Sequence, residues 1–159
     1  MASSVVGVWP QPQTVTSGLG TAWIDAHSFT LLQHGTAAAA SPALAAAFAR
    51  YRPLLFPHRT PASGATSASG STLAALTVRV HSATETTPRM GVDESYKLTV
   101  ARTPHDSEGW AATIEAPTLF GAYHGLGSFS QLVTFDFDEQ AYRVNGAPLR
   151  IVDAPRSVR

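Results

Sequence analysis

The sequence contains no cysteine and a single asparagine, Asn145. Without cysteine the chain has neither disulfides nor a thiolate, although many secreted domains share this lack, so the compartment stays open. Asn145 is followed by Gly146 and Ala147, which leaves no N-glycosylation sequon. Residues 1–13 show neither the basic nor the apolar region of a secretory signal, and no apolar run approaches the roughly 20 residues that span a bilayer. We expect no membrane span, and a protein that is either cytosolic or targeted by a segment outside this sequence.

Charged residues are also scarce. They make up 14% of the chain, against about 25% in typical soluble domains. Eleven basic and eleven acidic residues give a formal net charge of zero, and the basic residues form no cluster. Nucleic acids and anionic membranes bind clustered basic charge, so we expect neither as a partner. A surface with so little charge indicates that a docking partner covers part of it.

The length of 159 residues corresponds to one domain, which we place at 1–159. A chain of this size buries roughly 70% of the surface that it exposes when unfolded, so it can form a stable core without disulfides or a structural metal. The segment 59–72 is rich in Pro, Gly and Ser and is predicted to be a flexible surface loop.

Two helices and several strands are predicted. Ser41 and Pro42 form a typical helix start, and apolar residues follow at helical spacing up to Leu55. Residues 21–33 are predicted as strand material, and period-two alternation predicts strands at 76–80, 96–101 and 110–115. The last two are joined by residues 103–109, so we expect 96–101 to pair antiparallel with 110–116.

A second helix is predicted to begin near Thr118 and to continue to about 133. Its glycines each cost up to about 1 kcal/mol relative to Ala, which indicates close packing against a sheet or a neighbouring domain. Asn145-Gly146 predicts a two-residue hairpin between 142–144 and 148–151. The order of elements predicts an α+β fold, with an antiparallel or mixed sheet and two helices packed on one face.

The residue types that carry catalysis or bind metals form no recognised arrangement. The six histidines lack the spacing of a metal pair, and the acidic cluster 136–139 lacks the glycine and the downstream Glu of a calcium loop. The carboxylates at 93–94, 106 and 108 are predicted to be turn and cap residues. Ser128 lies in a helix without the glycines of a nucleophile elbow. We predict no catalytic, cofactor-binding or metal-binding residue.

Four segments resemble the N-terminal domain of eukaryotic-type β-N-acetylhexosaminidases, glycoside hydrolase family 20. They are VWPQPQTV at 8–15, DESYKLTV at 93–100, TLFGAYHGLGSFSQLV at 118–133 and VNGAPLRIVDAPR at 144–156. They follow one another in the order and spacing of that family. The helix carries Gly127-Ser128 where the family has Glu-Thr, and Ser157 follows Pro155-Arg156 where the family continues with an aromatic residue.

The resemblance implies a sheet with two helices that packs against a following catalytic (β/α)₈ barrel. The family removes terminal N-acetylglucosamine and N-acetylgalactosamine by substrate-assisted retention, and its catalytic Asp-Glu pair lies in the barrel. No catalytic residue carries over to this chain, and the lysosomal or secreted location of the family is not supported by a signal peptide here. The residues expected to serve packing are Trp9, Tyr96, Leu98, Gly121, Gly125, Leu126, Phe129 and Leu132.

The main hypothesis is therefore a non-catalytic N-terminal fragment of a hexosaminidase without its barrel. It predicts an isolated chain that is inactive and poorly soluble, because the glycine-bearing side of the second helix lacks the barrel. The alternative is a standalone binding or interaction module derived from the same domain. An enzyme complete in 159 residues is disfavoured, because no convergent catalytic groups are found.

Overall fold

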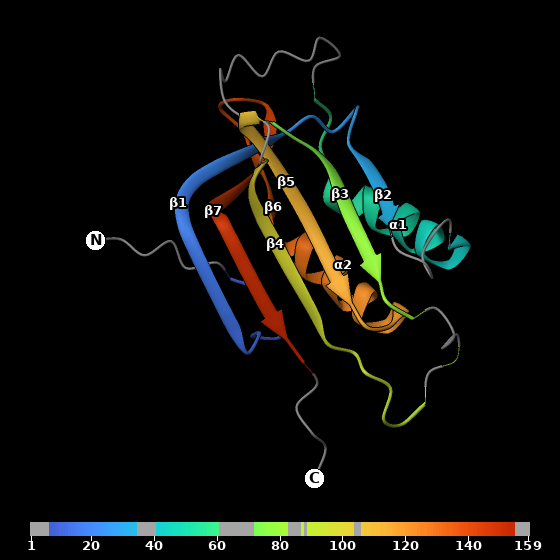
Figure 1. Cartoon of the computed structure of the whole chain (residues 1–159). Coiled ribbons are helices and arrows are strands. Elements are labelled where there is room, and N and C mark those ends of the chain that lie inside the picture. Colours follow the sequence, from blue (N-terminus) through green and yellow to red (C-terminus); the bar gives the residue numbers. More distant parts are fainter. Residues whose placement is uncertain are drawn as a thin grey trace.

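The computed structural model describes residues 7–34, 41–60, 72–82, 87, 89–103 and 106–154. Within them the chain forms β1 (Thr14–Ile24), β2 (Thr30–His34), α1 (Pro42–Leu55), β3 (Leu73–Val80), β4 (Tyr96–Thr103), β5 (Asp106–Ala116), α2 (Leu119–Leu132), β6 (Val133–Asp136) and β7 (Ala141–Asp153). Figure 1 shows their arrangement. Residues 61–71 of the predicted loop 59–72 lie outside the described residues.

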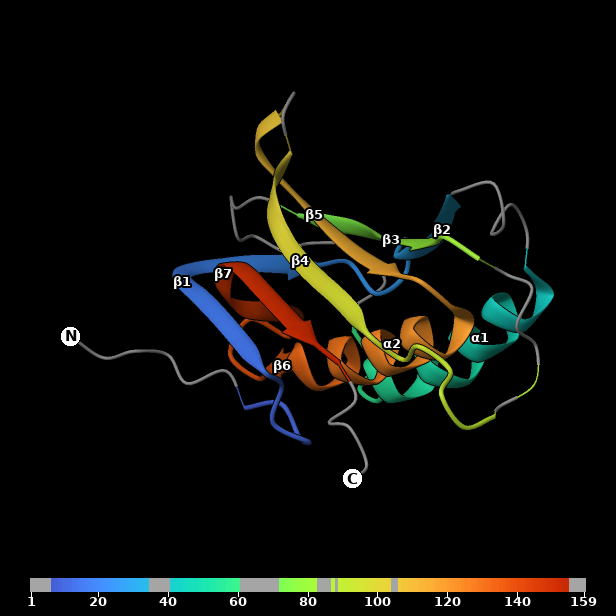
Figure 2. The same ribbon diagram turned by 60° about the horizontal axis from the view of Figure 1, so that its bottom comes forward.

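The strands form one mixed sheet in the order β1-β7-β4-β5-β3-β2, and β6 pairs with β7 beside this path. The β1-β7, β7-β4 and β4-β5 pairs are antiparallel, whereas β5-β3 and β3-β2 are parallel. Figure 2 shows both helices on the same side of this sheet. Helix α2 contacts β3, β4 and β5, and α1 packs against α2. The predicted α+β fold is therefore confirmed.

Both helices begin where they are predicted to, α1 at the predicted cap Ser41 and α2 after Thr118. Ser41 accepts a hydrogen bond from the backbone N–H of Leu44 at 3.3 Å, and Pro42 occupies the first turn of α1. Thr118 accepts one from the N–H of Gly121 at 3.3 Å. These side chains satisfy backbone donors that have no partner within the helix.

The predicted antiparallel pairing of 96–101 with 110–116 is confirmed. Lys97 lies opposite Glu115, and Arg102 lies opposite Trp110. Both strands run further than expected, because Thr103 still pairs with Asp106, and residues 103 and 106–109 of the predicted loop 103–109 belong to the strands. The predicted strand material at 21–33 is divided between β1, which begins earlier at Thr14, and β2.

The predicted hairpin at Asn145-Gly146 is wrong, because both residues lie inside the continuous strand β7. The segments on either side of them pair with β1 and not with each other: Leu149 lies opposite Ser17, and Asn145 lies opposite Thr21. The register shifts between these pairs, and Gly146 has a φ of 81°. Asn-Gly readily supplies the positive φ that hairpin turns need. Here the positive φ of Gly146 occurs instead at an irregularity within the long strand β7.

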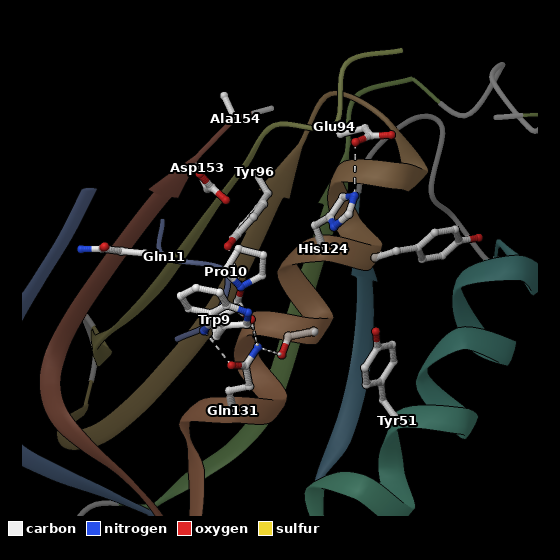
Figure 3. Close-up of a pocket in the computed structure, with 13 residues that line it drawn as sticks. Trp9, Pro10, Gln11, Tyr51, Glu94, Tyr96, His124, Gln131, Asp153 and Ala154 are labelled. Carbon is white, nitrogen blue, oxygen red and sulfur yellow. Dashed lines mark hydrogen bonds and ion pairs between the residues drawn. The ribbon is translucent and has the colours of Figure 1, made fainter. Parts of the chain in front are cut away.

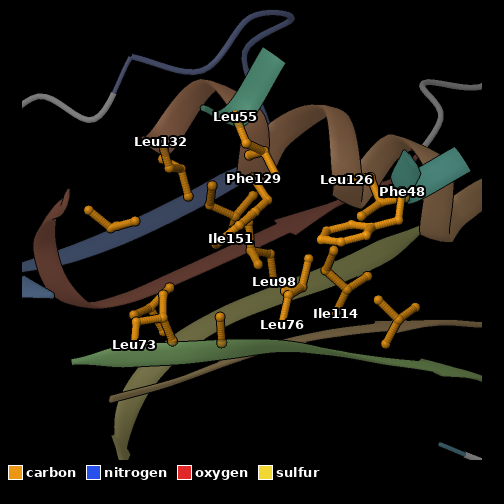
Figure 4. Packing of buried hydrophobic residues seen from close by; sticks show 14 of the residues in the cluster. Phe48, Leu55, Leu73, Leu76, Leu98, Ile114, Leu126, Phe129, Leu132 and Ile151 are labelled. Atoms are coloured by element: carbon orange, nitrogen blue, oxygen red, sulfur yellow. The ribbon is translucent and has the colours of Figure 1, made fainter. Parts of the chain in front are cut away.

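The core lies between the sheet and the helices (Figure 4). Phe129 of α2 is fully buried at its centre, and its ring stacks on Phe29 with centroids 6.0 Å apart. The other buried residues labelled in the figure come from both layers: Phe48, Leu55, Leu73, Leu76, Leu98, Ile114, Leu126, Leu132 and Ile151.

Two glycines let α2 approach the sheet closely. A Cβ atom at Gly121 would lie 2.1 Å from the carbonyl oxygen of Ser95, and one at Gly125 would lie 2.7 Å from Cγ2 of Ile114. The sequence predicts that these glycines pack against either a sheet or a neighbouring domain, and the structure shows the sheet. The expectation that this side is left for the barrel is therefore wrong for Gly121 and Gly125, which the domain's own strands cover, whereas Gly127 lies near the Tyr51 hydroxyl and not against the sheet.

Candidate functional site

A groove of about 650 Å³ opens on the helix side of the domain. Its walls are the segment that precedes β1, the end of β7, the start of β4 and both helices (Figure 3). The lining residues include four aromatic side chains, which are Trp9, Tyr51, Tyr96 and Tyr123. Residues far apart in the sequence thus form one concave surface.

Trp9 is fixed to α2 through its backbone. Its N–H donates to Oε1 of Gln131 at 2.8 Å, and its carbonyl oxygen accepts from Nε2 of the same amide at 2.9 Å. The indole itself is 81% exposed, whereas the neighbouring Val8 is buried. Within this chain Trp9 therefore does not join the core, unlike the other side chains expected to serve packing.

Tyr96 and Ser128 join the sheet to α2 at the groove. Their hydroxyl oxygens are 2.5 Å apart, and both residues are buried. Burial raises the pKa of Tyr96 above its ordinary value; the hydrogen bond with Ser128 acts in the opposite direction, and the negative charge of Asp153 adds to the rise. The phenol therefore stays protonated and keeps its hydrogen bond beyond the pH at which a free tyrosine ionises.

The raised pKa of Tyr96 predicts destabilisation at alkaline pH. A folded-state pKa above the unfolded value contributes stability below the unfolded pKa of about 10, and this contribution is lost as the pH rises through the folded value. Burial also raises the pKa of Tyr142. We expect the free energy of unfolding, measured in urea from about pH 8 to about pH 11, to fall at the alkaline end. Tyr96→Phe should make this fall shallower, leaving the part due to Tyr142; an unchanged slope would contradict the assignment.

The two carboxylates that line the groove already have partners. Glu94 forms an ion pair with His124, with 3.4 Å between Oε2 and Nε2, and Asp153 accepts a hydrogen bond from the N–H of Gln13 at 3.2 Å. A hydrolase that relies on acid and base carboxyls needs them free and aimed at a reacting atom. The groove shows no such pair.

Other carboxylates of the described residues stabilise turns or form surface ion pairs. Hydrogen bonds from Ser95 lower the pKa of Asp93. The N–H groups of Glu139 and Asp138 bind Asp136, lower its pKa, and leave it paired with Arg143. Side chains of the predicted cap residues 106 and 108 lie outside the described part.

No group of three or more His, Asp or Glu side chains in the described part of the chain is placed to hold a metal ion. Neither described helix is long and apolar enough to cross a membrane.

The residues expected to serve packing occupy three different places. Leu98, Leu126, Phe129 and Leu132 are buried in the core, and Gly121 and Gly125 contact the sheet. Tyr96 is buried where the groove meets β4, and Trp9 is exposed in it. Sequence reasoning missed most of the groove's other residues. The spacing of residues on α2 could have indicated part of it. One side of this helix carries, at spacings of three or four, His124, Gly127 or Ser128, and Gln131, and all of them line the groove.

A family model described as beta-acetyl hexosaminidase like matches residues 8–132. Beta-hexosaminidase 1 of Arabidopsis thaliana is 37% identical to this chain, over 98% of the chain and 29% of the relative. The beta-hexosaminidase subunit beta of Sus scrofa is 31% identical, over 95% of the chain and 27% of the relative. The chain thus spans less than a third of the length of these relatives.

The fold agrees with these matches. The solved structure of the chitobiase of Flavobacterium johnsoniae superposes with a TM-score of 0.62 at 21% identity, over 95% of this chain and 21% of that one. At that identity the superposition supports the fold alone, and the family rests on the sequence matches. The chain belongs to the glycoside hydrolase family 20 β-hexosaminidases, of which it represents the N-terminal domain.

Proposed function

We propose that this chain is the non-catalytic N-terminal domain of a β-N-acetylhexosaminidase and that it packs against a catalytic barrel joined to it. The enzyme would remove terminal N-acetylglucosamine or N-acetylgalactosamine from glycoconjugates. The observation that carries the proposal is the match of 98% of this chain to only 29% of a relative named as a hexosaminidase. Most of that relative lies outside the matched region, which leaves room there for a catalytic domain.

The described carboxylates support a structural role. Asp93 and Asp136 bind backbone N–H groups of turns, and Glu94 pairs with His124. A retaining hexosaminidase needs one carboxyl group as acid and another to orient the acetamido group. Groups already held by turns and ion pairs are poorly placed for either task.

The alternative of a standalone binding module is less well supported. The curated relatives quoted above are several times longer than this chain, and none is a single small domain.

Activity assays test the proposal directly. The isolated chain should release no chromophore from a chromogenic β-N-acetylglucosaminide, whereas the same chain joined after Ala154 to the remaining part of the Arabidopsis thaliana relative should. Turnover should be unchanged by Glu115→Gln in the joined protein, because that carboxylate pairs with Lys97 on the sheet and does not line the groove. Turnover by the isolated chain that Glu94→Gln or Asp93→Asn abolishes would overturn the proposal.

A further inference from the structure

We propose that the groove around Trp9 is the docking site for the polypeptide that follows Ala154, and that the Trp9 indole is the anchor of this contact. The inference rests on the proposed function, since it takes the joined catalytic domain as the occupant. It adds the surface, the anchoring side chain and the reason for their position.

The first argument is the state of Trp9. Burying a large aromatic side chain is favourable, because its apolar surface is removed from water. Trp is also enriched among the residues that dominate the binding energy at interfaces. Gln131 holds both backbone polar groups of Trp9, so the indole is presented from a fixed backbone. A preorganised anchor loses less conformational entropy when it binds.

The second argument is the direction of the chain. Asp153 and Ala154, where β7 ends, line the same groove as Trp9 (Figure 3). The end of β7 is held there, because Gln13 donates from its Nε2 to the carbonyl oxygen of Ala154 at 3.1 Å and from its N–H to Asp153. A domain joined after Ala154 therefore starts inside the groove, at an effective concentration of about millimolar or higher. No separate partner has this advantage.

The third argument concerns a sugar ligand, which an aromatic groove also suggests. Sugar sites offer free hydrogen-bonding groups beside an aromatic face. Here Gln131 is engaged by Trp9, Glu94 by His124, and Tyr96 by Ser128. The polar groups of these three lining side chains already have partners, and beside them lies aromatic area, which is typical of the centre of a protein interface.

Oxidative footprinting with hydroxyl radicals tests the proposal in the chain joined to the rest of the Arabidopsis thaliana relative. A peptide of residues 7–12 gives the rate for unprotected Trp9. The internal references are Met90, which is 98% exposed, and Phe129, which is fully buried. We expect Trp9 in the joined protein to react several-fold more slowly than in the peptide, because an indole in the core of an interface is shielded from solvent. Met90 should stay reactive and Phe129 protected.

The outcomes separate the possible occupants. A Trp9 rate in the joined protein equal to that of the peptide overturns the proposal. Protection of Trp9 in the isolated chain that increases with protein concentration also overturns it, because a second copy is then the occupant. Protection that requires added chitobiose overturns it as well, because the occupant is then a sugar. Hydrolysis of a chromogenic N-acetylglucosaminide is measured on the same joined sample. Activity with unprotected Trp9 refutes only the docking site, and inactivity with protected Trp9 refutes only the proposed function.

Discussion

Gly121→Ala should destabilise the domain severely. The added Cβ would lie 2.1 Å from the carbonyl oxygen of Ser95 and 3.1 Å from Cβ of Ala116. Neither is the end of a flexible side chain, so α2 would have to move away from β4 and β5. Overpacking of this kind costs about 3 kcal/mol, which lowers the melting temperature of a domain of this size by about 10 °C. Thermal and urea unfolding of the chain measure the effect.

Gly127→Ala is the matched control in the same helix. A Cβ there meets nothing closer than the Tyr51 hydroxyl at 3.4 Å, which is an ordinary contact. Alanine favours a helix over glycine by about 1 kcal/mol, so the melting temperature should rise by roughly 2–4 °C. If both substitutions destabilise equally, the helix is sensitive to alanine as such and the proposed close contact with the sheet is not the cause.

The sequence predicted those elements whose signals are local. Ser41 and Thr118 cap helices because their side chains reach N–H groups three residues on, and this depends on no distant part of the chain. The strands beginning at Tyr96 and ending at Ala116 alternate apolar and polar residues, which also fixed the face that each buries.

The failed hairpin shows where local signals stop. Asn145-Gly146 has the dipeptide of a tight turn, but the partner of both flanking segments is β1, more than a hundred residues earlier. The dipeptide indicates that Gly146 can adopt a positive φ, but it does not indicate which strand lies beside it. The same limit applies to the glycines of α2, since only the folded chain decides whether sheet or neighbouring domain covers them.

The groove was beyond prediction for a related reason. It joins Trp9, Tyr51, His124 and Asp153, which come from four separate segments. Trp9 entered the sequence analysis through its motif, with packing as its expected role. Its backbone hydrogen bonds to Gln131 connect residues that are 122 positions apart, and the sequence around neither residue predicts them.

Leu55→Ala should cost far more stability than Leu54→Ala, although the two leucines are neighbours in the last turn of α1. Leu55 is 2% exposed and belongs to the core, whereas Leu54 is 66% exposed. Truncating a buried leucine loses its transfer energy and leaves a cavity, at about 2–5 kcal/mol, while a surface substitution stays within about 0.5 kcal/mol.

The pair also tests how α1 is oriented on α2. Both variants remove the same atoms from the same helix, so differences in helix propensity and unfolded-state hydrophobicity cancel between them. Urea unfolding of each variant gives the two free energies at equal slope if both stay two-state. A larger loss for Leu54→Ala would mean that α1 presents its other side to α2, and the groove wall formed by Tyr51 would then be misplaced as well, because Leu55 follows Tyr51 by four residues on the same side of the helix.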